Sequence, residues 1–203
     1  MDASKYVAQH KIIGKIIDSD SEKLNVLVIA IPKDIVDMHY VLIRELGLKP
    51  VIMDYQSNGI WKLMNFADYF NNEITPSYKT IAAIDLGYNS ANITIVKKGA
   101  IQTNRVIDLG GEDLNDVTDI SGITMFDAIN KVFRYYLSKE TGNEIDIILL
   151  YGGLSLIKGI DKSFFNYFSI PTFILESIGR VNIKDDANKY INCIGAILRD
   201  DEV

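Results

Sequence analysis

The chain has 203 residues, which is enough for one ordinary domain or two small ones. Hydrophobic residues make up 48% and charged residues 24%, with one cysteine, and these values exclude intrinsic disorder, a collagen-like repeat and a disulfide scaffold. A formal net charge of −6 argues against a broad nucleic-acid-binding surface, so we expect no nucleic acid partner. No apolar run reaches the roughly 18 residues that span a bilayer. Residues 1–5 lack the apolar core of a signal peptide, so we expect a cytoplasmic protein.

The first elements along the chain are two predicted strands and a helix. Isoleucines in residues 9–18 favour a strand, and the continuous apolar run at residues 25–31 predicts a strand buried on both faces. Apolar residues at helical spacing predict a helix over residues 34–46. Gly47 and Pro50 follow as a left-handed terminator and a block to further helix.

A predicted strand at residues 51–54 and a predicted helix at residues 57–70 complete the first half. The next segment, residues 71–77, is polar and contains a proline, which is typical of a linker. We therefore divide the chain into a small α/β subdomain at residues 1–75 and a second domain at residues 76–203.

The second half predicts an antiparallel meander followed by alternating helices and strands. The predicted strands cover residues 80–86, 91–96, 100–107, 144–151 and 172–175, and the predicted helices cover residues 127–137, 162–168 and 188–199. This order is typical of an α/β sheet covered by helices on both faces. Cys193 lies in the apolar pattern of the last helix, so we expect it to be buried.

One candidate site lies where the strand at residues 80–86 ends. Asp85 is a carboxylate that could hold a hydrated magnesium ion, because magnesium prefers carboxylate oxygens and keeps its waters. Gly87 allows a close backbone approach, and Asn89 and Ser90 could hold a phosphate together with backbone N–H groups. The alternative is an ordinary hairpin in which Asp85 and Asn89 are turn residues.

A second candidate site follows the buried strand at residues 144–151. Gly152 and Gly153 would let a flat ring lie against the backbone, and ligands bind at the carboxyl ends of strands in open α/β sheets. The alternative is a strand-to-helix turn in which Ser155 is a helix cap. We expect this turn and the Asp85 turn to meet in one cleft.

Taken together, these sites and their strands resemble the actin-like ATPase fold, and most closely the type IV pilus assembly protein PilM family, related to the division protein FtsA. The segments that carry the resemblance follow the family's order and are residues 26–33, 45–50, 83–87, 99–111, 110–114, 152–159 and 194–199. The resemblance implies a partial actin-like (RNase H-like) α/β fold. It would comprise a small α/β subdomain and one mixed-sheet domain with helices on both faces.

The resemblance also implies a ligand and partners. ATP with magnesium would bind between the halves of the fold, with Asp85 at the metal. The residues expected to contact the cofactor are Asp85, Gly87, Asn89, Ser90, Gly110, Gly111, Gly152, Gly153 and Ser155. The implied partners are the cytoplasmic tail peptide of a PilN-like inner-membrane protein and other pilus-platform proteins. The chain would then lie at the inner face of the membrane, attached only through these partners.

Departures from the family pattern decide between scaffold and enzyme. No first phosphate motif precedes Lys5, only a short stretch separates Gly111 from the helix at residues 127–137, and the bulky Tyr88 stands in the phosphate turn. Phosphoryl transfer needs charge stabilisation from several sides, so we expect a scaffold without catalytic residues, with nucleotide binding weakened or lost.

Two alternatives remain open, namely a slow magnesium–ATP-binding ATPase and an FtsA-like polymer-forming division protein. The second is disfavoured by the acidic tail at residues 200–203, which anionic lipid would repel. The predicted strand near residues 12–17 would support either a homodimer or the addition of a peptide as an extra strand.

Overall fold

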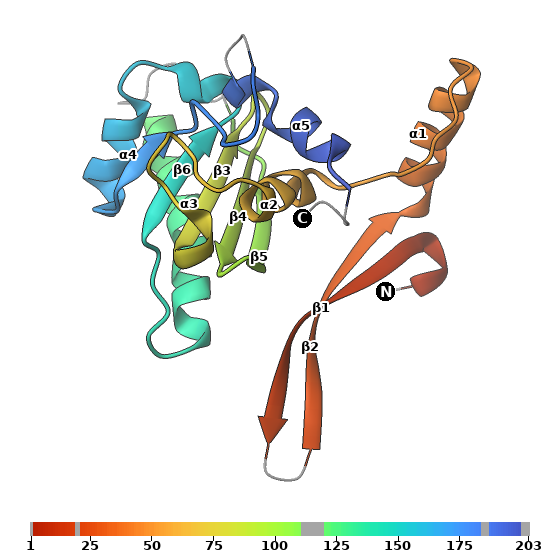
Figure 1. The fold of residues 1–203 in the computed structure, drawn as a ribbon, viewed down its shortest axis with the longest axis horizontal. Coiled ribbons are helices and arrows are strands. Elements are labelled where there is room, and N and C mark those ends of the chain that lie inside the picture. The colour runs from red at the N-terminus through yellow and green to blue at the C-terminus, as the bar shows by residue number, and fades with distance from the viewer. Residues whose placement is uncertain (1, 19–20, 111–119, 184–186, 200–203) are drawn as a thin grey trace. The chain divides into compact units, whose positions relative to one another are not determined.

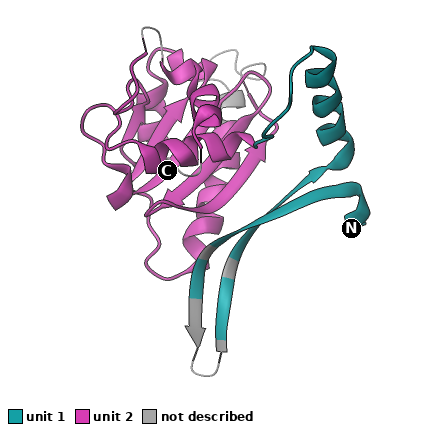
Figure 2. Ribbon diagram, turned by 45° about the vertical axis from the view of Figure 1, so that its right-hand side comes forward, with its two compact units in different colours: residues 1–54 teal, residues 55–203 magenta. Residues whose placement is uncertain are grey.

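The computed structural model describes residues 2–18, 21–110, 120–183 and 187–199 (Figure 1). These residues form two compact units, residues 1–54 and residues 55–203, which Figure 2 colours separately. The units divide the chain before the domain boundary that the sequence predicts at residues 75 and 76, because the helix that follows residue 55 packs within the second unit. The predicted boundary itself stays a prediction.

Unit 1 is an antiparallel ribbon followed by one helix. A short 3-10 turn, η1 (Ala3–Lys5), leads into β1 (Tyr6–Asp18), which pairs with β2 (Ser21–Pro32). The helix α1 (Lys33–Glu45) starts directly after Pro32, and Gly47 follows it with a φ of +74°. The positive φ explains the glycine, because other residues rarely adopt it.

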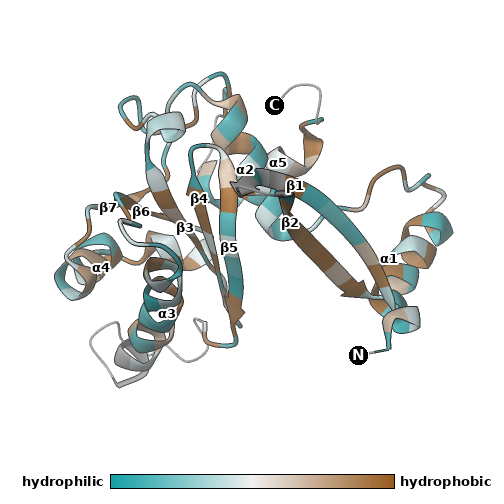
Figure 3. Ribbon diagram, turned by 90° about the horizontal axis from the view of Figure 1, so that it is seen from below, coloured by the Kyte–Doolittle hydropathy of each residue, from teal (hydrophilic) through white to brown (hydrophobic). Residues whose placement is uncertain are grey.

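Two expectations about unit 1 are wrong. The described residues of β2 are all partly or fully exposed, so β2 is not a strand buried on both faces. A two-stranded ribbon with one helix has too few layers to bury a strand. Residues 51–54 form no strand either, because no neighbouring strand pairs with them among the described residues. Figure 3 shows the apolar character of β2 along much of its length.

Unit 2 contains a five-stranded mixed sheet in the order β5-β4-β3-β6-β7. Its strands are β3 (Thr80–Leu86), β4 (Ala91–Lys97), β5 (Ala100–Ile107), β6 (Ile147–Tyr151) and β7 (Thr172–Ile174). The first three form the predicted antiparallel meander, and β6 and β7 run parallel to β3. The predicted mixed sheet is therefore confirmed.

Helices cover both faces of this sheet (Figure 1). The four α-helices are α2 (Gln56–Phe66), α3 (Ile120–Lys139), α4 (Ile160–Phe168) and α5 (Ile191–Ile197), with 3-10 turns η2 (Pro76–Tyr78), η3 (Gly153–Leu156) and η4 (Ala187–Lys189). Alternate residues of β3 and β6, such as Ile84 and Leu150, pack with α3 and α4 in the main core. Because side chains alternate along a strand, Asp85 and Tyr151 face the layer of α2 and α5.

The helices α2 and α5 pack closely on each other. A Cβ atom added to Gly195 would overlap the carbonyl group of Gly59. At the far end of the pair, the buried Lys62 donates from Nζ to the carbonyl oxygen of Leu198 at 3.0 Å. Cys193 of α5 is exposed, so the expectation that it is buried is wrong.

The hairpin between β4 and β5 is anchored to α2. Trp61 donates from Nε1 to the carbonyl oxygen of Gly99 at 2.6 Å, and Asn65 donates to the same oxygen at 3.2 Å. Lys98 and Gly99 form the turn with positive φ values.

No helix among the described residues is both long enough and apolar enough to span a bilayer.

Candidate functional site

The two predicted turns lie side by side at one edge of the sheet. Asp85 on β3 is the register partner of Tyr151 on β6, so the turns that follow these parallel strands leave the sheet together. Gly152 lies so close to Asp85 that an added Cβ would overlap its Oδ1. The two turns are therefore adjacent, as expected, and a shared cleft between them stays a prediction.

The first turn is a tight hairpin. The N–H of Gly87 donates to the carbonyl oxygen of Ser90 at 3.0 Å, so the turn itself uses this donor. Tyr88 and Asn89 are exposed at its tip. Gly110 lies against the turn, because a Cβ there would lie 2.6 Å from the nitrogen of Ser90. Gly111, the other glycine expected at the cofactor, lies outside the described residues.

The second turn is held by the segment that leads into α5. Gly152 has a φ of +88°, and its N–H donates to the carbonyl oxygen of Asn188 at 3.1 Å. The hydroxyl of Ser155 donates to the carbonyl oxygen of Gly152 at 2.7 Å and accepts from Asn188 Nδ2 at 3.1 Å. Ser155 is fully buried, whereas Gly153 faces open space. Ser155 therefore shapes the turn from within η3; it is not a helix cap, because Gly152 precedes η3, Gly159 precedes α4, and neither helix start has a side-chain cap bond.

Two residues that sequence reasoning missed contact the central carboxylate. Gln56, the first residue of α2, donates from Nε2 to Asp85 Oδ2, and Asn192 of α5 donates from Nδ2 to the same oxygen at 2.7 Å. These residues are 29 and 107 positions from Asp85. No local motif marks them, so only the tertiary fold identifies them.

The environment of Asp85 disfavours its charge. The residue is only 6% exposed, and burial raises the pKa of its carboxyl group, against the lowering effect of the hydrogen bonds from Asn192 and Gln56. Burial also raises the pKa of the Tyr151 phenol well above its ordinary value, and the charge of Asp85 adds to this effect. A neutral phenol and two neutral amides thus surround a single carboxylate.

Three buried polar atoms in this layer lack hydrogen-bond partners within the described part of the chain. They are Tyr151 Oη, Asn188 Oδ1 and Asn192 Oδ1. Buried polar atoms are nearly always hydrogen-bonded in native proteins, and an exception is explained by strain, a functional role, or a bound water or ion. This layer is therefore the polar centre of unit 2 and its strongest candidate for a small polar ligand.

The residues as arranged do not fit a hydrated magnesium ion on Asp85. Oδ2 already accepts two amide N–H groups, and the carboxylate is buried beside Gly152 rather than open to a metal's water shell. The Gly87 N–H that a phosphate would need is engaged in the hairpin. Among the described residues, no group of three His, Cys, Asp or Glu side chains could hold a metal. Binding of ATP with magnesium stays a prediction.

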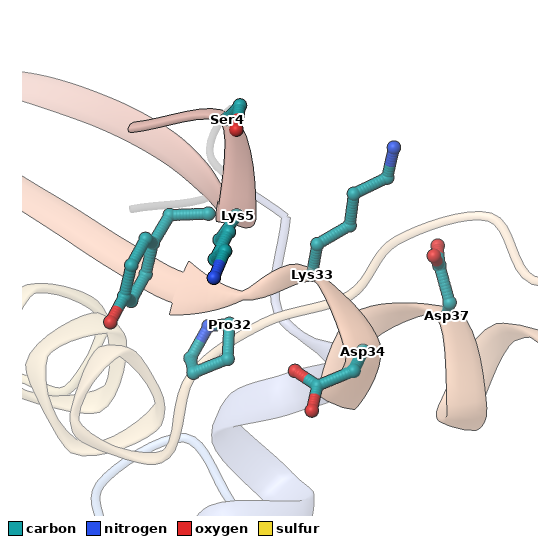
Figure 4. Close-up of a pocket in the computed structure, with 7 residues that line it drawn as sticks. Ser4, Lys5, Pro32, Lys33, Asp34 and Asp37 are labelled. Atoms are coloured by element: carbon teal, nitrogen blue, oxygen red, sulfur yellow. The ribbon is translucent and has the colours of Figure 1, made fainter. Parts of the chain in front are cut away.

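Unit 1 has a separate pocket of about 580 Å³ at the end of the ribbon where Tyr6 pairs with Pro32 (Figure 4). Its lining includes two lysines, Lys5 and Lys33, and two aspartates, Asp34 and Asp37. The pocket therefore presents charged groups of both signs.

Comparison with solved structures shows an actin-like fold. A chain of the PilM–PilN type IV pilus biogenesis complex matches with a TM-score of 0.74 and 13% identity, over 95% of this chain and 66% of that chain. MreB5 of Spiroplasma citri bound to ADP matches with a TM-score of 0.54 and 17% identity, over 82% of this chain and 64% of that chain. A Bacteroides thetaiotaomicron protein with an actin-like ATPase fold matches with a TM-score of 0.50 and 11% identity, over 95% and 58% of the two chains.

The chain spans less than two thirds of the length of each of these three solved relatives. No curated protein sequence matches it. The sequence model of type IV pilus assembly protein PilM matches residues 9–128, which is more than half of the 203 residues. The chain therefore has a partial actin-like fold and belongs to the type IV pilus assembly protein PilM family.

Proposed function

We propose that this chain is a scaffold of type IV pilus assembly that binds the cytoplasmic tail of a PilN-like membrane protein. It would act in the cytoplasm at the inner face of the membrane, and would reach the membrane through that partner and other platform proteins. Family membership supports the pilus role, and the likeness to a chain of a PilM–PilN complex supports the partner.

The observation that carries the tail-binding proposal is the ribbon of unit 1. Within the described residues, β1 and β2 form a two-stranded sheet, so each has an edge without a neighbouring strand. Residues 24–32 of β2 contain no charged side chain, although charges commonly protect exposed edges. Such an edge suits an extended peptide that adds as a further strand, and the mixed-charge pocket lies at the ribbon's end.

The experiment is a calorimetric titration of the full chain with a synthetic peptide of the cytoplasmic tail of a PilN-like protein from the same organism. Val28→Lys on β2 should weaken binding at least tenfold, because it places a charge on the ribbon. Met38→Lys on α1 is the matched control, since both side chains are 61% exposed. Absence of binding by the folded wild-type chain, or equal loss in both variants, contradicts the proposal.

Pairing of two copies through the same edges is the competing use of the ribbon. Sedimentation velocity separates the two: a dimer that Val28→Lys dissociates, in a chain that binds no tail peptide, would favour self-association.

We further propose that nucleotide binding is weakened or lost. The internal bonds of Asp85 and Gly87 support this, whereas the unpartnered polar atoms near Asp85 favour the alternative, a slow ATPase. A ligand at 100 times its dissociation constant adds about 2.7 kcal/mol to the free energy of unfolding, which gives a visible thermal shift. We expect no shift with millimolar magnesium–ATP, and a clear shift would support the ATPase.

A further inference from the structure

We infer that Asp85 is a positioning residue that fastens α5 to α2 through hydrogen bonds from both helices to one carboxylate oxygen. This role differs from the magnesium ligand that the family resemblance implies for the same residue. It is independent of tail binding by unit 1.

The hydrogen bonds of Asp85 tie together three elements that are distant in sequence. Oδ2 accepts from Gln56 at the start of α2 and from Asn192 in the first turn of α5, while Asp85 itself is the last residue but one of the buried strand β3. A strand in the core of the sheet is a rigid platform. The carboxylate therefore sets the position of both helix ends relative to the sheet.

The packing beside Asp85 requires that position to be accurate. Gly59 and Gly195 bring the backbones of α2 and α5 into direct contact, one turn along each helix from Gln56 and Asn192. Glycines allow the two helices to approach closely, but they do not fix where along each helix the contact forms. The hydrogen bonds from Gln56 and Asn192 to Asp85 fix that position.

The second end of α5 has an attachment of its own. Lys62 donates to the carbonyl oxygen of Leu198 just beyond the helix. Loss of Asp85 should therefore release the first turn of α5 more than its last. This difference between the two ends of α5 distinguishes the loss of a local contact from a general destabilisation of unit 2.

The same segment also holds the second glycine turn. Asn188 accepts from Gly152 through its carbonyl oxygen and donates to Ser155 through its side chain. Residues 187–197 thus touch Asp85 with Asn192 and the Gly152 turn with Asn188. Fastening α5 in this way keeps the two turns together.

The chemistry around Asp85 suits a fastening better than a metal ligand. Its two donors are neutral amides, and its register neighbour Tyr151 is a neutral phenol. Burial already raises the pKa of Asp85, so the site does not favour the full charge that a magnesium ligand should keep. An acceptor oxygen is what the two amides require.

This requirement gives a test by conservative rescue. Asp85→Asn keeps one acceptor oxygen and removes the charge, whereas Asp85→Ala removes the acceptor of both N–H groups, that of the half-buried Asn192 and that of the exposed Gln56. We expect the thermal midpoint of Asp85→Ala to fall by about 5 °C and that of Asp85→Asn to equal or exceed the wild-type value. Asp108→Ala, at an exposed position, is the matched control and should leave the midpoint unchanged.

Hydrogen exchange locates the effect. In Asp85→Ala, amides of α5 near residues 191–194 should exchange faster, while those of β4 and β5 keep their protection. If Asp85→Ala fails to fold, Asn192→Asp replaces it, because two facing carboxylates lower the midpoint at pH 8 and recover it at pH 5 by sharing a proton.

Three results overturn the inference. They are an Asp85→Asn midpoint as low as that of Asp85→Ala, an unchanged midpoint in Asp85→Ala, and a magnesium-dependent stabilisation of the wild type that Asp85→Asn abolishes. The last result would show that Asp85 is a magnesium ligand.

Discussion

The backbone of Gly195 in α5 lies directly against the backbone of Gly59 in α2, with no room for a Cβ atom on Gly195. Gly195→Ala should therefore push the helices apart and lower the free energy of unfolding by about 1–3 kcal/mol. Urea denaturation followed by circular dichroism measures this loss. Cys193→Ala, on the exposed side of α5, should stay within about 0.5 kcal/mol of the wild type. Equal stability of the two variants would refute the close contact.

Gly152 should be the glycine least able to accept a side chain. Gly152→Ala would combine a positive φ with an overlap onto Asp85 Oδ1, so we expect a loss of about 3 kcal/mol or more. The adjacent Gly153→Ala is the control, because its Cβ would meet open space. Thermal melts of both variants make the comparison, and a tolerated Gly152→Ala would contradict the described turn.

The stability of unit 2 should depend on pH through Asp85. Its pKa is raised in the folded protein, so the folded state holds the proton more tightly than the unfolded chain, whose aspartates titrate near about 3.9. The stabilisation from that proton is present below this value and is lost as pH rises towards the folded pKa. Stability of the wild type minus that of Asp85→Asn should fall with pH and then level off. A difference that rises with pH would show the opposite shift.

A buried polar network beneath α2 should be sensitive to truncation. Asn104 Nδ2 lies 2.5 Å from Ser57 Oγ, 2.6 Å from Asn92 Oδ1 and 3.1 Å from Thr94 Oγ1. Asn104→Ala removes this shared donor, while Ser57 Oγ still accepts from Asn92 Nδ2 at 3.1 Å, so we expect a loss of about 1–3 kcal/mol. Gln102→Ala, at a partly exposed position on the same strand, is the control. Chemical denaturation compares them, and equal stability would mean that Asn104 does not sustain the network.

Local sequence signals predict the elements of unit 2 well. Alternation and tight turns place β3 and β5 at their observed bounds, and helical spacing identifies α4 and α5 within a few residues. The same signals mislead in unit 1, where the apolar residues of β2 imply a burial that its described neighbours do not provide. Apolar content reports a preference for burial, but only the surrounding layers decide the outcome.

The residues of the candidate site also fall into those that the sequence predicts and those that only the fold identifies. Asp85 lies near the end of β3 and Gly152 directly follows β6, with Ser155 in the next turn, so a single sequence suffices to find them. Gln56 and Asn192 reach Asp85 only because α2 and α5 cross the same sheet edge. Neither the residue type nor the spacing of Asn192 indicates that it contacts Asp85, which lies 107 positions away in the sequence.

The placement of Trp61 decides what optical spectroscopy can see. This residue is the sole tryptophan of the chain, and its indole bonds to the β4–β5 hairpin within unit 2. Emission at long ultraviolet wavelengths therefore reports the melting of the part of unit 2 around α2 and the β4–β5 hairpin. A chain whose circular dichroism changes before its emission does has lost structure outside this region first.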